Sequence, residues 1–314
     1  MVTVKYDYKI KKLLENLERL SPRRWENEYI TAEFIKGYLS NYDFDVHVQE
    51  YKVVYPMYKE WYLYVDGELI KSLPCGLESG YLDDAIILDG VEVLEKGFNV
   101  DYPAIQYNRF CSDISSPIHT LSPCLSVSRE DIEKIKKAKE VDGYLKVKYK
   151  VLKQQNILVG NSENPEKIVF THYDSVWGGT VDNGLSVAIL LGIIDKIDLS
   201  KVLIVFSGTE ELSMNWPIYW GYGYRMFEEK FIDIMHNAEE IIVIDCIGHT
   251  ELVVTKDKFL IEEAFPIESK DILNKTKLLT GDYYELMKFY HSFSDNIEKV
   301  KYIEYKKVLE EISV

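Results

Sequence analysis

The sequence has too few basic residues to suit a nucleic-acid-binding protein. Its 314 residues include 37 Lys and Arg against 52 Asp and Glu, which gives a formal net charge of −15 at pH 7. Phosphate groups attract proteins through a basic surface, and so does an anionic membrane. We therefore expect neither a nucleic acid nor a membrane as a partner.

Long apolar segments are also missing. No apolar run is long enough to cross a bilayer. Residues 1–20 alternate Lys and Glu with apolar residues, unlike the apolar core of a secretory signal. The chain has 46% hydrophobic and 28% charged residues, which is ordinary for a folded protein. We expect a cytoplasmic protein, and the sequence leaves its oligomeric state open, a homo-oligomer included.

Closely spaced cysteine pairs are absent as well. Cys75, Cys111, Cys124 and Cys246 lack the spacing of a zinc knuckle or a redox motif, so we interpret them as buried small side chains. Glutamine is scarce, whereas Lys, Glu, Ile and Tyr are abundant, which resembles the composition of thermophile proteins. In a thermophile, a disulfide among the first three cysteines is a hypothesis that fits this composition.

The first half of the chain begins with predicted helices and continues as a segment rich in turns and short strands. Apolar spacings of three and four predict a helix over 5–20, and a helix over 26–39 and a strand over 44–54 follow. Residues 51–150 are rich in turn signals and short strands, with a hairpin at Asp66-Gly67 and one helix over 129–139. This middle part is predicted to be a small β-rich insert.

Strands alternate with helices after residue 150. Apolar runs predict strands over 168–171, 202–206 and 240–244, and helices over 184–197, 225–237 and 302–312. Such alternation indicates a mostly parallel sheet covered by helices. Ligands of these sheets bind beyond the carboxyl ends of the strands. Polar side chains that follow the strands are therefore expected to share one site.

Five potential metal ligands lie in this second half, mostly at strand ends: His172, Asp182, Glu211, Asp245 and His291. Two imidazoles and three carboxylates suit a pair of zinc ions that share one bridging carboxylate. Such a pair activates water at neutral pH and stabilises a tetrahedral intermediate. The sequence therefore predicts metal-assisted hydrolysis.

Two further carboxylates stand beside these candidate ligands. Asp174, two residues after His172, is placed to accept the second imidazole N–H and fix its tautomer, or otherwise to support the site. Glu210 directly precedes Glu211, and a carboxylate beside the attacking water can act as a general base. Both are therefore predicted to take part in catalysis.

Each short motif also has a structural alternative. The His-x-Asp piece fits an ordinary turn after a strand, and the Glu-Glu pair fits an exposed loop. Asp182 precedes a predicted helix, where Asp is a preferred capping residue, and a lone histidine such as His291 is more often structural. Asp245 differs, because a charge at the end of a buried strand is costly unless it is paired or coordinated.

The order and setting of these residues resemble the zinc-dependent aminopeptidase family of bacterial leucyl aminopeptidase, glutamate carboxypeptidase II and the transferrin receptor, which also includes glutaminyl cyclases. The match extends to the two N-terminal helices, and the region from Ser122 to Val159 is similar to the end of a protease-associated insert. The matching motifs are His172-Tyr173-Asp174-Ser175, Asp182-Asn183, Glu210-Glu211, Asp245, and His291 with Asp295.

The resemblance implies a role for each candidate. Asp182 is expected to bridge the two zinc ions, with His172 and Asp245 on one ion. Glu211 and His291 are expected on the other ion, and Glu210 is expected to be the general base. The aromatic segment 215–224 departs from the family pattern and bears on the choice of substrate.

Together these predictions describe a three-layer α/β/α fold with a mostly parallel mixed sheet. Residues 1–50 and 151–314 are expected to form a zinc peptidase domain, and 51–150 a protease-associated-like insert. The expected function is that of a co-catalytic di-zinc aminopeptidase that removes the N-terminal residue from peptides. Two alternatives remain open: a glutaminyl-cyclase-like enzyme with a single zinc, and a catalytically inactive binding homologue.

Overall fold

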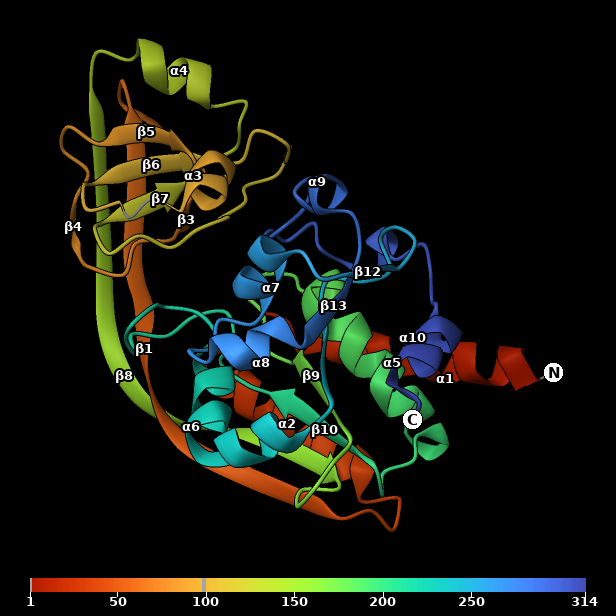
Figure 1. Cartoon of the computed structure of the whole chain (residues 1–314). Coiled ribbons are helices and arrows are strands. Elements are labelled where there is room, and N and C mark those ends of the chain that lie inside the picture. The colour runs from red at the N-terminus through yellow and green to blue at the C-terminus, as the bar shows by residue number, and fades with distance from the viewer. Residues whose placement is uncertain (1, 98–99) are drawn as a thin grey trace. The chain divides into compact units, whose positions relative to one another are not determined.

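The computed structural model describes residues 2–97 and 100–314, and the chain divides into two compact units (Figure 1). Unit 1 comprises Met1–Val53, Leu152–Asp282 and Asp295–Val314. Unit 2 comprises Val54–Val151 and Tyr283–Ser294. The second unit therefore includes a short segment from near the C-terminus, which the sequence analysis assigned to the peptidase domain.

A mixed sheet forms the centre of unit 1. Its strand order is β12-β13-β11-β9-β10-β8-β1, and the neighbours from β13 to β10 are parallel. The edge strand β12 and the pairing of β8 with β10 are antiparallel. The strands are β1 (Val46–Val65), β8 (Val141–Gly160), β9 (Lys167–His172), β10 (Val202–Ser207), β11 (Glu240–Ile244), β12 (Val253–Thr255) and β13 (Thr276–Thr280).

Helices cover both faces of this sheet, so unit 1 has three layers. One core joins α1, α2, α5 and α10 to residues of β9, β10 and β11, and the other joins α6, α7 and α8 to the opposite face. Every residue of β10 is buried, as expected for a strand covered on both sides. The helices are α1 (Val2–Arg19), α2 (Glu26–Leu39), α5 (Leu185–Ile193), α6 (Tyr222–Asn237), α7 (Lys258–Ala264), α8 (Lys270–Asn274) and α10 (Tyr305–Ile312).

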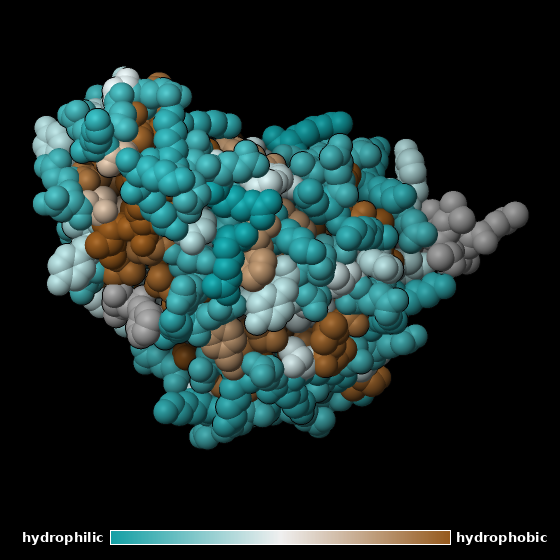
Figure 2. All heavy atoms as spheres, turned by 90° about the horizontal axis from the view of Figure 1, so that it is seen from above, coloured by the Kyte–Doolittle hydropathy of each residue, from teal (hydrophilic) through white to brown (hydrophobic). Residues whose placement is uncertain are grey.

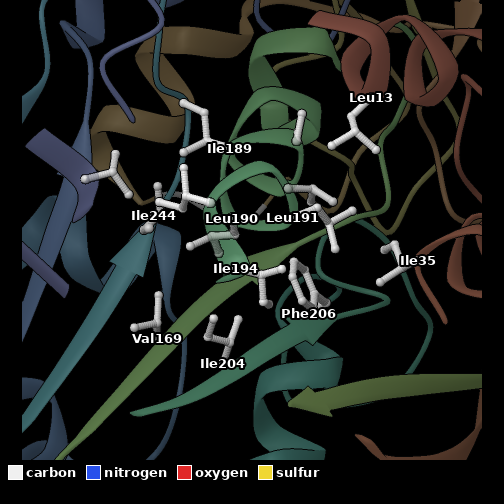
Figure 3. Packing of buried hydrophobic residues seen from close by; sticks show 14 of the residues in the cluster. Leu13, Ile35, Val169, Ile189, Leu190, Leu191, Ile194, Ile204, Phe206 and Ile244 are labelled. Carbon is white, nitrogen blue, oxygen red and sulfur yellow. The ribbon is translucent and has the colours of Figure 1, made fainter. Parts of the chain in front are cut away.

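Helix α5 lies at the centre of the first core. All nine of its residues are buried, and Figure 3 shows Ile189, Leu190 and Leu191 of this helix among side chains from the strands and α1. A helix that is apolar on every side must be covered all round. Gly192 permits the close approach of α1, because a Cβ added there would lie 2.5 Å from Cγ1 of Ile10.

Unit 2 contains a small sheet of four strands in the order β3-β7-β6-β5, with β5, β6 and β7 parallel. Asp66 and Gly67 form the predicted hairpin turn between β1 and β2, and both have positive φ angles. The remaining elements of this unit are β2 (Glu68–Leu69), β3 (Leu73–Pro74), β4 (Gly80–Tyr81), β5 (Ile86–Asp89), α3 (Gly90–Lys96), β6 (Ala104–Tyr107), β7 (Cys124–Ser126), α4 (Ile132–Lys137) and α9 (Tyr283–Leu286).

The fold differs from the sequence predictions in two regions. Between residues 245 and 301 the sequence predicted no element, whereas the structure has β12, α7, α8 and β13 there. The other differences lie in the middle of the chain. β1 and β8 are each single strands of 20 residues that run from one unit into the other, whereas the sequence predicted shorter strands separated by turns. Helix α3 was not predicted; Asp89 caps its start and Gly97 ends it with a φ of 63°. The length of β1 and β8 could not be predicted from local signals, because pairing partners far along the chain decide how far a strand extends.

The four cysteines are buried and free, so within the described residues no disulfide joins Cys75, Cys111 and Cys124. Cys75 directly follows β3, and its N–H donates to the carbonyl of Cys124, the first residue of β7, at 3.1 Å.

Among the described helices, none combines the length and apolar character needed to cross a membrane. Figure 2 shows a face covered mostly by hydrophilic residues, with hydrophobic side chains gathered in smaller areas.

The packing of α1 on α5 predicts opposite effects for the same substitution at two helical glycines. Gly192→Ala gains about 1 kcal/mol of helix propensity but forces Ile10 aside, so we expect a net loss of about 1 kcal/mol of unfolding free energy. Gly37→Ala in α2 is the matched control, since nothing lies within 4 Å of its added Cβ. It should stabilise the protein by about 0.5 kcal/mol. Urea unfolding measures both, and a stabilised Gly192→Ala protein would contradict the packing described.

Candidate functional site

The carboxyl ends of three parallel strands bring the site together. His172 is the last residue of β9, Asp245 directly follows β11, and Glu210 and Glu211 lie in the loop that follows β10. Ser207 at the end of β10 pairs with His172, which places the two strand ends side by side. The site therefore forms where parallel α/β sheets generally bind their ligands.

The imidazole of His172 lies between three carboxylates. Its Nε2 is 3.2 Å from Oδ1 of Asp182 and 3.3 Å from Oδ1 of Asp245, and its Nδ1 is 3.4 Å from Oδ1 of Asp174. Donor atoms of His172, Asp182 and Glu211 all lie within 4.8 Å of one another, and the three side chains are buried. This arrangement offers one nitrogen and several carboxylate oxygens to a single small volume.

Asp182 reaches the site from an irregular turn, Thr180–Gly184, that precedes α5. The carboxylate of Asp295 holds this turn, because it accepts the N–H of Val181 at 2.8 Å and the N–H of Asp182 at 3.0 Å. The amide of the next residue, Asn183, donates to the Ile244 carbonyl at 2.8 Å and so ties the turn to the end of β11. The Asp182–Asn183 peptide bond is cis.

Asp174 holds the loop of the two glutamates in the same way. Its carboxylate accepts the N–H of Glu210 at 3.1 Å and the N–H of Glu211 at 2.9 Å. The same group faces Nδ1 of His172, which keeps Nε2 directed to the other carboxylates. Asp174 therefore supports both a candidate ligand and the candidate base, as a second layer of residues commonly does around metal sites.

Glu28 of α2 and the Tyr173 hydroxyl restrain the two residues just before Glu210. Thr209 has a φ of 52°, uncommon for a residue other than glycine, and its Oγ1 donates to Oε1 of buried Glu28 at 2.7 Å. Gly208 has no room for a side chain, since an added Cβ would lie 2.6 Å from the Tyr173 hydroxyl and 2.7 Å from Oε1 of Glu28. Such constrained backbone is common at functional sites.

Arg23 is a fully buried cation beneath these loops. It lies in the connection between α1 and α2; its Nε donates to the Tyr173 carbonyl and its Nη2 to the Gly179 carbonyl, each at 2.7 Å. Nη1 donates to Oγ of Ser21 at 2.8 Å, and the backbone N–H of Arg23 donates to Oγ of Ser175 at 3.0 Å. The side chain thus connects the backbone near His172 with the start of the turn that carries Asp182.

Burial and crowding shift the ionisation of the site. Burial alone would lower the pKa of His172, but its hydrogen bonds with Asp174 and then Asp182 and Asp245 raise that pKa well above its usual range. Burial raises the pKa of Glu210 well above that of an ordinary glutamate, and neighbouring carboxylates add to this. Burial also raises the pKa of Asp295 to about 7.

Burial and neighbouring carboxylates also act on the guanidinium of Arg23. Burial lowers its pKa, while the charges of Asp295 and Asp174 oppose that shift. An arginine stays protonated even so. Arg23 is therefore a permanent positive charge near several buried carboxylates.

His291 belongs to unit 2, where its Nδ1 lies 3.1 Å from the Ser116 carbonyl. A carbonyl can only accept, so this contact requires the proton on Nδ1. The ring stacks on Tyr290 with centroids 3.7 Å apart, and the residue has a φ of 46°. The role of His291 as a metal ligand stays a prediction from the sequence.

The structure thus brings His172, Asp182, Glu211 and Asp245 together in unit 1, with Glu210 and Asp174 beside them. It also reveals residues that the sequence analysis did not single out for the site, namely Arg23, Glu28 and Cys246. Only Cys246 carried a sequence signal, because it directly follows Asp245.

Comparison with known proteins identifies the fold. No protein-family model and no curated protein matches the chain. A zinc aminopeptidase from Bacillus subtilis is similar, with a TM-score of 0.68 and 18% identity over 98% of this chain and 93% of that one. An aminopeptidase from an Aneurinibacillus strain has a TM-score of 0.60 and 14% identity, with 97% and 92% covered. A peptidase M28 precursor from Shewanella amazonensis has a TM-score of 0.64 and 12% identity, with 97% and 90% covered. The chain therefore has the mixed α/β fold of these peptidases.

Removal of the buried cation should disrupt the site and the fold together. Arg23→Met deprives three carbonyls of their donor and takes away a positive charge near four carboxylates, so we expect a loss of about 3 kcal/mol or more of unfolding free energy. Arg19→Met, at an exposed position of α1, is the matched control and should change stability by less than about 0.5 kcal/mol. Chemical unfolding of the metal-free proteins measures both, and equal stability of the two variants would contradict the role assigned to Arg23.

Proposed function

We propose that the protein is a zinc-dependent aminopeptidase that hydrolyses the N-terminal residue from peptides, with two zinc ions in its active site. One observation carries the proposal: buried donor atoms of His172, Asp182 and Glu211 converge within 4.8 Å at the carboxyl ends of the parallel strands. The mixed α/β fold shared with the zinc aminopeptidase from Bacillus subtilis supports it.

The charges of the cluster fit a bound cation. Asp182 and Asp245 both approach Nε2 of His172, and one imidazolium cannot balance several buried carboxylates. Arg23 does not pair with them directly, because its guanidinium donates to backbone carbonyls and to a serine hydroxyl. Since buried charge is costly unless it is paired or coordinated, the cluster suits a divalent metal.

The donor types suit zinc, which binds imidazole nitrogen and carboxylate oxygen. Asp182 converges with His172 and Glu211 in one group of possible metal ligands, and with Asp245 and Cys246 in another. It is therefore the proposed bridge between the two ions, with His172 and Asp245 on one of them. Glu211 is the proposed ligand of the other ion, together with His291 as predicted from the sequence. Zinc bound here would lower the pKa of water and polarise the scissile carbonyl.

Glu210 is the proposed general base. It lies next to Glu211 and is 6% exposed, so its side chain is shielded from bulk solvent, and its charge interacts with those of His172 and Asp245. It would take a proton from the attacking water as the new C–O bond forms and deliver that proton to the leaving amine as the C–N bond breaks. Asp174 would keep this carboxylate in place by binding the N–H groups of Glu210 and Glu211.

Metal content and activity in one sample test the proposal. We expect two zinc ions per chain and release of N-terminal residues from a panel of aminoacyl amides, with loss of activity on chelation. Glu210→Gln should retain its zinc yet lose about 10²–10⁴-fold in kcat, because only the proton carrier is removed. Glu240→Gln is the matched control, since Glu240 lies at the opposite end of β11, and it should retain activity.

Other outcomes would redirect the assignment. Full activity of metal-loaded Glu210→Gln would remove Glu210 from the mechanism. A single zinc ion with no release of N-terminal residues would favour glutaminyl cyclisation, and no metal at saturating zinc would favour a binding protein. Loss of one of two zinc ions in His291→Ala would support His291 as a ligand.

A further inference from the structure

A buried amide joins the two ends of the loop that carries Glu210 and Glu211. This loop follows β10 and leads into the first turn of α6, so Gly208 lies at its start and Gly223 just past its end. Asn156 of β8 bridges them: its Oδ1 accepts the Gly208 N–H at 3.3 Å, and its Nδ2 donates to the Gly223 carbonyl at 2.8 Å. We call the place where Gly208 and Gly223 approach each other the neck of the loop.

The amide of Asn156 has a partner for each of its polar groups. Its Oδ1 also accepts the Ser207 hydroxyl at 2.9 Å, and the Tyr51 hydroxyl lies 3.2 Å from it. Its Nδ2 also donates to Oε1 of Gln49 at 3.0 Å. The side chain is fully buried, and only an amide offers two N–H donors together with a carbonyl acceptor. A carboxylate of the same size would have no hydrogen to donate to the Gly223 carbonyl.

Helix α6 meets the neck without space for a side chain. The Gly223 N–H donates to the Thr209 carbonyl at 3.2 Å, and the Gly221 N–H donates to the Glu210 carbonyl. A Cβ added to Gly223 would overlap the carbonyl oxygen of Gly208. That oxygen belongs to the backbone, so a side chain at Gly223 would push the start of the loop away from α6.

We propose that Asn156 is a positioning residue for Glu210, because its amide joins the two ends of the loop and so fixes where the proposed general base stands. The inference rests on the proposed peptidase function and deepens it. Asp174 binds the N–H groups of Glu210 and Glu211 within the loop, whereas Asn156 sets where the loop begins and ends. Misplacement of a catalytic group by about 1 Å can lower a rate about 10²-fold, so the geometry of the neck affects kcat.

Asn156→Asp is the most selective variant, because it keeps an acceptor for the Gly208 N–H and loses the donor to the Gly223 carbonyl. At saturating zinc we expect kcat for aminoacyl amides to fall by about 10–10²-fold. KM should change little, because the groups that bind the substrate are left in place. Val159→Ala is the matched control: Val159 lies on the same strand, is fully buried and packs in the core around α5. It should lower stability and keep kcat.

Gly223→Ala tests the same neck without changing Asn156 or adding a charge. The new methyl group displaces the Gly208 carbonyl, so we expect a loss of kcat similar to that of Asn156→Asp. Gly37→Ala is the control for this substitution, since nothing lies within 4 Å of its added Cβ, and it should keep kcat. Far-ultraviolet circular dichroism establishes that each variant is folded.

Hydrogen exchange of the metal-free full chain gives a readout that does not depend on activity. Peptides from residues 207–223 should exchange faster in Asn156→Asp and Gly223→Ala than in wild type, because an open neck frees the N–H groups of Gly208 and Gly223. Exchange of α5 in the same samples serves as the internal reference. Val159→Ala should not show faster exchange of 207–223 relative to α5.

The outcomes separate this proposal from the function on which it rests. Unchanged kcat in folded Asn156→Asp would overturn the role of Asn156 and leave the peptidase function intact. If that variant does not fold, unchanged kcat in Gly223→Ala overturns the role instead. An equal loss of kcat in Val159→Ala, or equal exchange of 207–223 in all variants, would also overturn it. Wild-type protein that releases no N-terminal residue at saturating zinc would refute the proposed function, and the role of Asn156 with it.

Discussion

The concentration of buried negative charge at the ends of β9, β10 and β11 is the constraint on which the rest of the site depends. His172 is surrounded by three carboxylates at 3.2 to 3.4 Å, and Glu210 and Glu211 lie in the adjacent loop. A protein interior tolerates such charge only when it is neutralised by counter-ions, protons or hydrogen bonds. The surrounding structure supplies hydrogen bonds and the buried cation Arg23, and zinc is proposed to supply further positive charge.

Two carboxylates outside the proposed ligand set share one function. Asp174 accepts the N–H groups of Glu210 and Glu211, and Asp295 accepts those of Val181 and Asp182. Each therefore holds a loop by its backbone, and the side chains of the proposed ligands face the proposed metal position. Hydrogen bonds to charged acceptors are stronger than those to neutral ones, which suits loops that must keep the proposed metal-binding atoms in place.

The left-handed backbone at Cys246 and Thr209 shows that both loops depart from regular strand geometry next to their functional residues.

Local sequence determined much of this protein. Periodic apolar residues marked β10, β11 and the helices α1, α2, α5, α6 and α10, and the Asp66-Gly67 pair specified a hairpin turn, because these signals arise from neighbours in the chain. Carboxylates and histidine placed just after apolar strands indicated a site, because parallel strands collect their carboxyl ends at one edge. Tertiary structure decided the rest. Arg23 binds the Gly179 carbonyl 156 residues away, and Asp295 binds a turn 113 residues before it. No local pattern encodes such partners, nor the left-handed turn that directs Cys246 toward Asp182, since both depend on backbone positions that only the folded chain brings together.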